Sequence, residues 1–299
     1  MAEHHEHSHS HSHSHGHGHG HGHGHGHGPQ DVETLERLAD LLDRDAEVLG
    51  SRLDDITAWA AEYAPGSVRR VIDIGAGTGT GTLALARRFD AADLVAIDRW
   101  PTMVERVRAA GAAHGLDGRL RVVEADLDAG WPADLGGNGT GAVDVAWASA
   151  SLHEVADPDR LLRDVRAALA PGGVLVVVEM DSLPRFLPDS VGNGLEDRCH
   201  ATLAGDGWNS FPDWREHLDR AGFDVADQRS FEVVRPATES NRRYARLNVE
   251  RMRSALADRL SEEDRRILDD LLTDDHPDSV LLRDDLTVRI GRIGWVARA

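Results

Sequence analysis

Apolar residues recur in steps of three and four near the start of the chain, between Pro29 and Pro65. This spacing predicts amphipathic helices with Asp31 as N-cap, a break at Gly50 and an end at Pro65 and Gly66. The apolar positions are Val32, Leu35, Leu38, Leu42, Ala46, Leu49, Leu53, Ile56, Ala60 and Tyr63. We therefore expect a helical cap over residues 29–66, whose helices either cover a ligand cleft or serve only in packing.

From residue 67 onward, short apolar runs alternate with helical periodicity, which is typical of βαβ units and a parallel sheet. Buried strands are expected at 71–74, 94–97, 120–127, 143–149 and 174–179, followed by further strands at 230–234 and 286–296. Helices are expected at 211–221, at 238–260 and after Ser261, an N-cap followed by acidic residues. The pattern predicts an α/β fold with helical insertions at about 181–221 and 236–285.

A glycine-dense turn links the first strand to an Ala/Leu-rich helix. It reads D-x-G-x-G-x-G, from Asp73 through Gly75 and Gly77 to Gly79. Such a turn lets the backbone approach a ligand closely, and the helix that follows offers free N–H groups. A dinucleotide site needs G-x-G-x-x-G, but Thr80 stands where the third glycine is required.

Acidic residues follow the next two strands as well. Asp98 ends the second strand, and Asp126 stands at the end of the third within Glu-Ala-Asp-Leu. Because ligands of α/β sheets bind beyond the carboxyl ends of the strands, Asp98 is placed to accept both hydroxyls of a ribose. Asp126 is either a ligand contact or a cap of the local turn.

The fourth strand continues into Leu-His-Glu-Val, and a helix follows with Asp157 as N-cap and Pro158 at its first position. A Pro-Gly-Gly turn at 171–173 then leads into the fifth strand. These segments, together with the glycine turn, resemble the class I S-adenosylmethionine (SAM)-dependent methyltransferases. The likeness extends from about residue 70 to 180. It is strongest to methyltransferases of ubiquinone and menaquinone biosynthesis and to those that methylate small molecules.

The resemblance implies a Rossmann-like, doubly wound, seven-stranded sheet whose last strand runs antiparallel between strands five and six. It implies a SAM-binding methyltransferase domain over 67–299, with the insertions shaping the pocket of a small-molecule acceptor. The acid of the second strand would hold ribose, and Trp100 or Met103 would pack on adenine. The implied cofactor-binding residues are Asp73, Gly75, Ala76, Gly77, Gly79, Asp98, Arg99, Met103, Asp126, Leu127 and Ala148.

Transfer of a methyl group to oxygen or nitrogen also requires the loss of a proton from the acceptor. His153 follows the fourth strand on the ligand side and is the candidate base; the alternative is a hydrogen-bonded loop residue that shapes the SAM pocket. Glu179 ends the fifth strand on the same side, either as an acceptor contact or as a cap. Trp208, Phe211, Trp214 and Tyr244 are candidate walls of the acceptor pocket or members of the core.

The formal net charge is -19, and all 33 basic residues are Arg. Such an acidic chain repels phosphate backbones and anionic lipid, so no nucleic-acid or membrane partner is expected. The single cysteine, Cys199, excludes a disulfide framework and favours the reducing cytoplasm. The oligomeric state stays open.

Thirteen of the 18 histidines lie within residues 1–28, in His-Ser and His-Gly repeats. Such a segment lacks core-forming residues, so we expect a disordered tail with weak, non-catalytic affinity for nickel or zinc. Two alternatives to the methyltransferase therefore stay open. One is a nicotinamide-dependent oxidoreductase, and the other is a non-catalytic SAM- or metal-binding protein.

Overall fold

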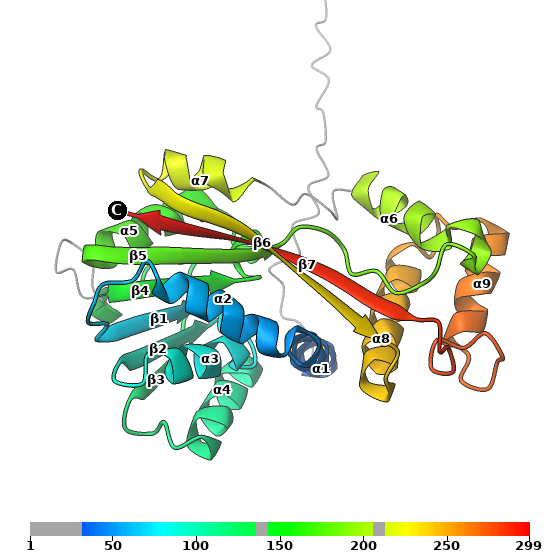
Figure 1. Cartoon of the computed structure of the whole chain (residues 1–299), viewed down its shortest axis with the longest axis horizontal. Coiled ribbons are helices and arrows are strands. Elements are labelled where there is room, and N and C mark those ends of the chain that lie inside the picture. Colours follow the sequence, from blue (N-terminus) through cyan, green and yellow to red (C-terminus); the bar gives the residue numbers. More distant parts are fainter. Residues whose placement is uncertain (1–31, 136–142, 206–212) are drawn as a thin grey trace, which may run out of the picture.

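The computed structural model describes residues 32–135, 143–205 and 213–299 (Figure 1). The histidine-rich tail, the expected N-cap at Asp31 and the candidate walls Trp208 and Phe211 lie outside the described residues.

The described residues form one seven-stranded sheet with the order β3-β2-β1-β4-β5-β7-β6. All neighbours pair in parallel except β7, which runs antiparallel to both β5 and β6. The expected doubly wound sheet with an antiparallel last strand is thus confirmed. The strands are β1 (Arg70–Ile74), β2 (Asp93–Asp98), β3 (Leu120–Glu124), β4 (Val143–Ser149), β5 (Leu169–Met180), β6 (Asp224–Pro236) and β7 (Thr287–Arg298).

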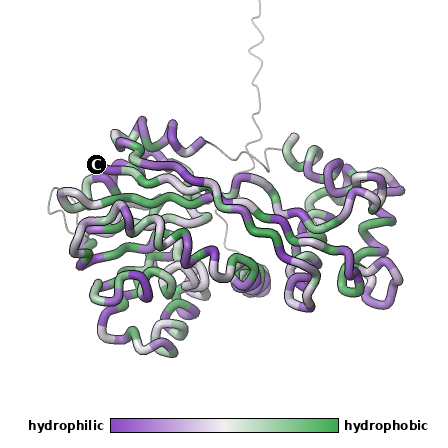
Figure 2. The backbone as a smooth tube through the Cα atoms, viewed as in Figure 1, coloured by the Kyte–Doolittle hydropathy of each residue, from purple (hydrophilic) through white to green (hydrophobic). Residues whose placement is uncertain are grey.

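Helices cover both faces of the sheet because successive strand residues point to opposite sides. Val71 and Trp147 pack on one face with α2 (Ser51–Ala61) and α3 (Thr80–Arg88), and α4 (Pro101–Ala113) lies beside them (Figure 1). The alternate residues Ile72 and Ile74 pack on the other face with α5 (Pro158–Ala168) and α7 (Trp214–Arg220). Figure 2 shows the hydrophobic stretches along the central strands that these two layers enclose.

The ribbon formed by β6 and β7 reaches past the end of β5. Met180, the last residue of β5, pairs with Arg292, whereas β6 and β7 stay paired as far as Pro236 and Thr287. Five further residues of β7 therefore extend about 17 Å beyond the carboxyl edge. There the ribbon meets α6 (Leu195–Gly205), α8 (Glu239–Ala255) and α9 (Glu262–Leu272), which form a second helical group (Figure 1).

Several element boundaries differ from the sequence-based expectation. Strand β6 begins at Asp224 instead of residue 230, because a bulge between Val225 and Asp227 lets polar residues keep pairing with β7. The third strand ends at Glu124, which leaves Asp126 in the loop that follows. Helix α8 ends at Ala255, five residues earlier than expected. The break at Gly50 and the N-caps Asp157 and Ser261 are confirmed.

Helix α1 (Val32–Leu49) joins the ribbon to the rest of the molecule through Asp45. The Arg292 Nη2 group donates to both carboxylate oxygens of Asp45, at 2.8 and 2.6 Å, and the Tyr244 hydroxyl donates to Oδ1 at 2.8 Å. The side chain of Arg292 is only 4% exposed, so its charge depends on this one carboxylate. Asp45 therefore links α1 to α8 and β7.

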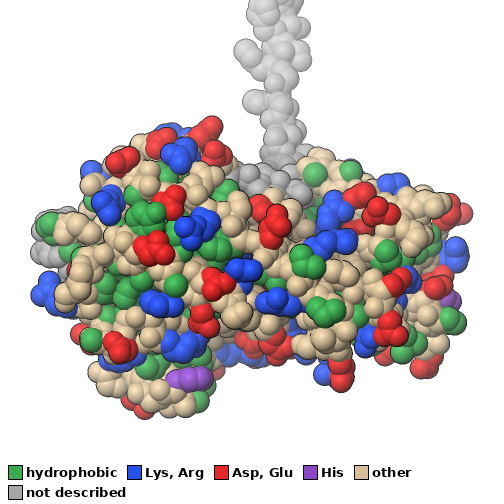
Figure 3. All heavy atoms as spheres, viewed as in Figure 1, with side chains coloured by type: hydrophobic (Ala, Val, Ile, Leu, Met, Phe, Trp, Pro, Cys, Tyr) green, Lys and Arg blue, Asp and Glu red, His purple; other side chains and the backbone are tan. Residues whose placement is uncertain are grey.

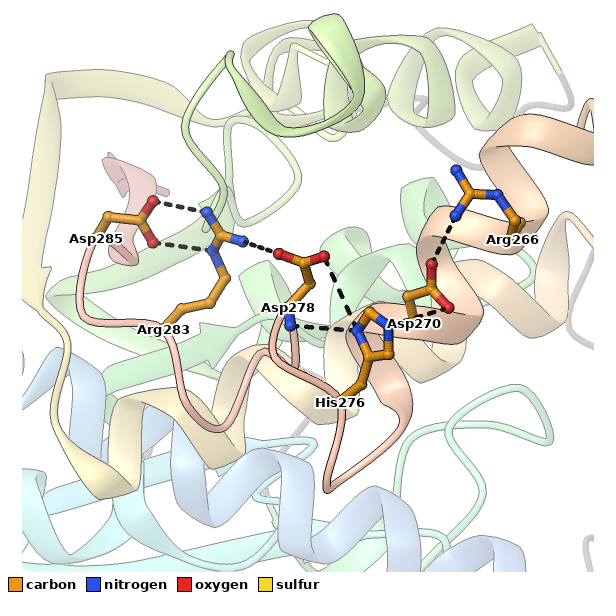
Figure 4. Close-up of polar contacts among 6 residues, drawn as sticks. All are labelled: Arg266, Asp270, His276, Asp278, Arg283 and Asp285. Atoms are coloured by element: carbon orange, nitrogen blue, oxygen red, sulfur yellow. Dashed lines mark hydrogen bonds and ion pairs between the residues drawn. The ribbon is translucent and has the colours of Figure 1, made fainter.

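The loop between α9 and β7 is held by a chain of polar contacts near the surface (Figure 4). Arg283 donates to both oxygens of Asp285, at 2.9 and 2.6 Å, while the backbone N–H of Asp278 donates to Nδ1 of His276 at 3.2 Å. Such exposed pairs contribute little stability each, about 0–1 kcal/mol. Val280 and Leu286 of the same loop are buried in the core, so these polar contacts act at its surface.

We expect Asp45→Asn to lower the free energy of unfolding by about 3 kcal/mol, because it leaves the buried Arg292 without its counter-charge. Asp43→Asn on the same helix is the matched control. Asp43 pairs with Arg106 at 2.9 Å, but both side chains are more than a third exposed, so a loss below about 1 kcal/mol is expected. Urea unfolding measures both, and equal losses would contradict the role of Asp45.

Candidate ligand site at the carboxyl edge of the sheet

The turn after β1 is shaped by three left-handed glycines. Gly75, Gly77 and Gly79 have φ of +68°, +53° and +92°, a region that other residues adopt at a cost. Each glycine also faces a different neighbour. A Cβ on Gly75 would lie 2.5 Å from Cβ of Ser151, one on Gly77 would lie 3.2 Å from Leu42, and one on Gly79 would lie 3.3 Å from Val107.

Asp98 closes this turn from the neighbouring strand. Its Oδ2 accepts the N–H of Gly77 at 2.9 Å, and its Oδ1 accepts the N–H of Trp100 at 2.9 Å. Burial raises the pKa of the Asp98 carboxyl, and the two backbone N–H groups partly oppose that shift. Because each carboxylate oxygen can accept more than one hydrogen bond, both retain capacity for hydroxyl donors of a ligand.

Asp73 lies beneath the first turn of α3, on the same face of the sheet as Asp98. Its Oδ2 accepts the hydroxyl of Thr82 at 2.6 Å. Burial raises the pKa of Asp73 to about 7, the Thr82 hydrogen bond lowers it, and the charge of Asp98 adds to the increase. Within this group, the Nε1 atom of Trp147 is buried with no hydrogen-bond partner. Asp73 of β1 and Asp98 at the end of β2 are thus two acidic groups in poorly solvated surroundings.

The other predicted contacts are distributed unevenly around the turn. Asp126 is exposed, and its Oδ1 caps the local turn by accepting the N–H of Asp128 at 3.0 Å. Arg99 lies 3.8 Å from Glu154 and stacks on the ring of Trp100. Met103 is 1% exposed, so in this structure it is a packing residue of α4. The remaining predicted contacts, Ala76, Leu127 and Ala148, are buried near the strand ends.

His153 lies in a short 3-10 helix, Leu152–Glu154, that follows β4. Its Nδ1 is 2.9 Å from Oε2 of Glu179, and Oε1 of Glu179 accepts the N–H groups of Ser151 and Leu152, each at 3.1 Å. Burial lowers the pKa of His153, but the hydrogen bond and charge of Glu179 and the charge of Glu154 outweigh it, so the pKa is raised. The site therefore combines acidic groups with one partly exposed imidazole.

Two neighbours of the turn were not singled out from the sequence. The hydroxyl of Ser151 donates to the carbonyl of Ile74 at 2.7 Å, and its Cβ rests against Gly75. Ala150, just before it, has φ of +51°, a strained value for a residue with a side chain. This strain directs the segment back over the turn. In the sequence, only the position of Ser151 two residues before His153 pointed to this neighbourhood.

The surface shows two hollows away from these strand ends. A hollow of about 930 Å³ lies between α2 and β6, and one of about 270 Å³ lies beside α9. Acidic and basic side chains are intermixed over the face that Figure 3 shows. Neither hollow includes a predicted site residue.

Within the described ranges, no cluster of three or more side chains is suited to hold a metal ion. Among the helices of those ranges, none is long and apolar enough to cross a membrane.

Comparisons with known proteins agree with this arrangement. The methyltransferase-domain family matches residues 71–173. A demethylmenaquinone methyltransferase of Thermus thermophilus is 34% identical over 127 residues, 42% of this chain and 52% of that protein. A trans-aconitate 2-methyltransferase of Delftia acidovorans is 34% identical over 132 residues, 40% of this chain and 46% of that protein. The chain spans about half the length of these curated relatives.

Solved structures share the fold at low sequence identity. A SAM-dependent methyltransferase of Thiobacillus denitrificans, in complex with S-adenosyl-L-homocysteine, is 18% identical with a TM-score of 0.51. The match covers 90% of this chain and 100% of that one. The YcgJ protein of Bacillus subtilis is 16% identical with a TM-score of 0.52, over 82% and 98% of the two chains.

The strand order and the antiparallel β7 define the class I methyltransferase fold. This fold and the match of residues 71–173 to the methyltransferase-domain family are what the chain shares with the class I SAM-dependent methyltransferases.

We expect Gly75→Ala to destabilise the protein more than Gly115→Ala does. Both glycines have φ near +70°, which costs an alanine about 1–2 kcal/mol. Only at Gly75 does the new Cβ collide with another residue, Ser151, whereas Gly115 has open space, so a further loss of about 1–3 kcal/mol is expected. Adding Ser151→Gly should narrow the difference in unfolding free energy, and no narrowing would contradict the contact.

We expect Asp73→Asn to be more stable than the wild type, by a difference in unfolding free energy that grows as the pH rises from 5 to 8. The pKa of Asp73 is about 7 in the folded protein against 3.8 for a solvent-exposed aspartate. Its stabilising neutral form is therefore fully present below about pH 4 and lost as the pH passes through 7. The gain should grow by about 2 kcal/mol across this range. Thermal unfolding measures it, and a pH-independent difference would contradict the raised pKa.

Proposed function

We propose that the protein is a SAM-dependent methyltransferase that acts on a small-molecule acceptor. The observation that carries the proposal is the pair of buried acids, Asp73 and Asp98, beside a turn that has glycine at three of its five positions. Burial disfavours both carboxylates, and a positively charged ligand would offset that cost. SAM brings an ammonium and a sulfonium together with ribose hydroxyls.

Two observations disfavour the nicotinamide-dependent oxidoreductase. A dinucleotide places its pyrophosphate on the turn after β1, where a carboxylate on the buried Asp73 would repel it. Thr80, the N-terminal residue of α3, also stands where a dinucleotide turn requires its third glycine. Asp98 does not discriminate, because an acid at the end of the second strand can accept ribose hydroxyls from either cofactor.

We assign the ribose hydroxyls to Asp98 and the amino-acid end of SAM to the turn Gly75–Gly79 with Asp73 nearby. Asp126 and the backbone of Leu127 would meet the adenine, since they follow the neighbouring strand β3. Ala76, Arg99, Met103 and Ala148 complete the walls around these positions. When bound, SAM supplies a methyl group on a positively charged sulfur, ready for in-line displacement.

His153 is the proposed base for an oxygen or nitrogen acceptor. It combines partial exposure, a raised pKa and a position at the carboxyl edge beside the turn. The acceptor would lie between this edge and the helices carried by the β6–β7 ribbon, because insertions at that edge shape substrate pockets. The curated relatives are named for demethylmenaquinone and trans-aconitate. The proposed acceptor class is likewise a small metabolite.

We further propose a cytoplasmic enzyme without a nucleic-acid or membrane partner, on the basis of its single cysteine and its net charge of -19. The histidine-rich tail would bind nickel or zinc as an accessory, outside the reaction.

Isothermal titration with SAM tests the proposal. The wild type should bind SAM, and Asp98→Ala should weaken binding about 100-fold, since two charge-assisted hydrogen bonds to ribose are lost. Asp93→Ala, at the exposed start of the same strand, should bind as the wild type does. A wild-type protein that binds NAD but not SAM would refute the proposal, and an unchanged affinity in Asp98→Ala would refute the assigned pocket.

A further inference from the structure

Glu179 makes more contacts than a strand-end cap requires. It is the penultimate residue of β5, 4% exposed, and its two oxygens are used differently. Oε1 accepts the backbone N–H groups of Ser151 and Leu152, which fixes the segment that carries His153. Oε2 is directed to Nδ1 of the imidazole at 2.9 Å.

This arrangement determines which nitrogen of His153 carries the hydrogen. An ionised carboxylate only accepts hydrogen bonds, so Nδ1 must be the donor. In a neutral imidazole the other nitrogen, Nε2, then holds the lone pair. The side chain of His153 is 35% exposed, and Nε2 is the ring nitrogen that Glu179 does not engage.

Other charged groups lie around the imidazole. Oε1 of Glu154, within the same 3-10 helix, lies 3.5 Å from Nε2, and Oε2 of Glu154 lies 3.8 Å from Arg99 of the β2–α4 connection. Arg292 of β7 is near enough for its charge to lower the pKa of His153. Arg251 of α8 interacts electrostatically with Glu154. Glu179 is the group in this set that is both buried and directly hydrogen-bonded to the ring.

We propose that Glu179 is a positioning residue that holds His153 in the Nδ1–H tautomer and thereby makes Nε2 the base for the acceptor. The inference rests on the proposed methyl transfer. The acceptor atom forms its bond to the methyl carbon as the carbon–sulfur bond breaks, and that electron pair stays on sulfur. The acceptor's proton moves to Nε2 of His153, Nδ1 keeps its hydrogen, and Glu179 keeps its charge.

Nitrogen-15 NMR of the imidazoles in the full-length chain tests the tautomer without any acceptor. The signal of His153 is identified by its loss in His153→Gln. Above its pKa, we expect Nδ1 to be protonated and Nε2 bare, whereas unconstrained histidine favours the opposite tautomer. An Nε2–H tautomer in the wild type would overturn the proposal.

Glu179→Gln then tests the cause. The amide oxygen can still accept from Ser151 and Leu152, but its NH₂ group faces Nδ1, which should reverse the tautomer and lower the pKa of His153 by about one unit. Glu154→Gln is the matched control, a carboxylate beside the same ring that does not contact Nδ1, and it should leave the tautomer unchanged. An unchanged tautomer in Glu179→Gln would contradict the proposal.

The pH dependence of kcat distinguishes a positioning role of Glu179 from a purely structural one, which would not shift the profile. In Glu179→Gln, the acid limb of the kcat–pH profile should shift to lower pH by about the same unit, while the KM for SAM stays unchanged. A profile that does not move would overturn the positioning role. Absence of SAM binding in the wild type would instead refute the proposed function, and the tautomer result would still stand by itself.

Discussion

The turn after β1 has glycine at three of its five positions, and three other segments rest on those glycines. Ser151 of the β4 loop lies against Gly75, Leu42 of α1 against Gly77 and Val107 of α4 against Gly79. Any of the three glycines would meet a neighbour if it carried a Cβ, and each also has a positive φ. The relative positions of α1, α4 and the β4 loop therefore depend on this turn, and so does the shape of the ligand site between them.

Helix α1 extends this dependence to the distant helical group. Leu42 touches the turn, and one turn further along the helix Asp45 holds the buried Arg292 of the ribbon and Tyr244 of α8. Arg292 in turn lies close enough to His153 for its charge to act on it. The glycine turn, His153 and the helical group at the end of the ribbon are thus connected through a few contacts of α1 and β7.

The strands and their order followed from apolar runs and from the resemblance, because buried parallel strands are nearly continuous in Val, Ile and Leu. The boundaries of β6 did not follow, since it is an edge strand whose many polar residues hide its length. The acids Asp73 and Asp98 were found because their motif is local in sequence. Leu42 and Ser151 were missed because they meet the turn only through tertiary packing. Oδ1 of Asp126 caps the local turn, which is the alternative to the ligand contact that the sequence favoured for this residue.

Hydrogen exchange of the full-length chain with and without S-adenosylhomocysteine tests the central claim most directly, since it reports where a ligand sits on the backbone. The account predicts slower exchange at the amides of residues 75–81 and 97–103, the turn and the segment that follows β2. Protection confined to the hollow between α2 and β6, with no change at the turn, would contradict it.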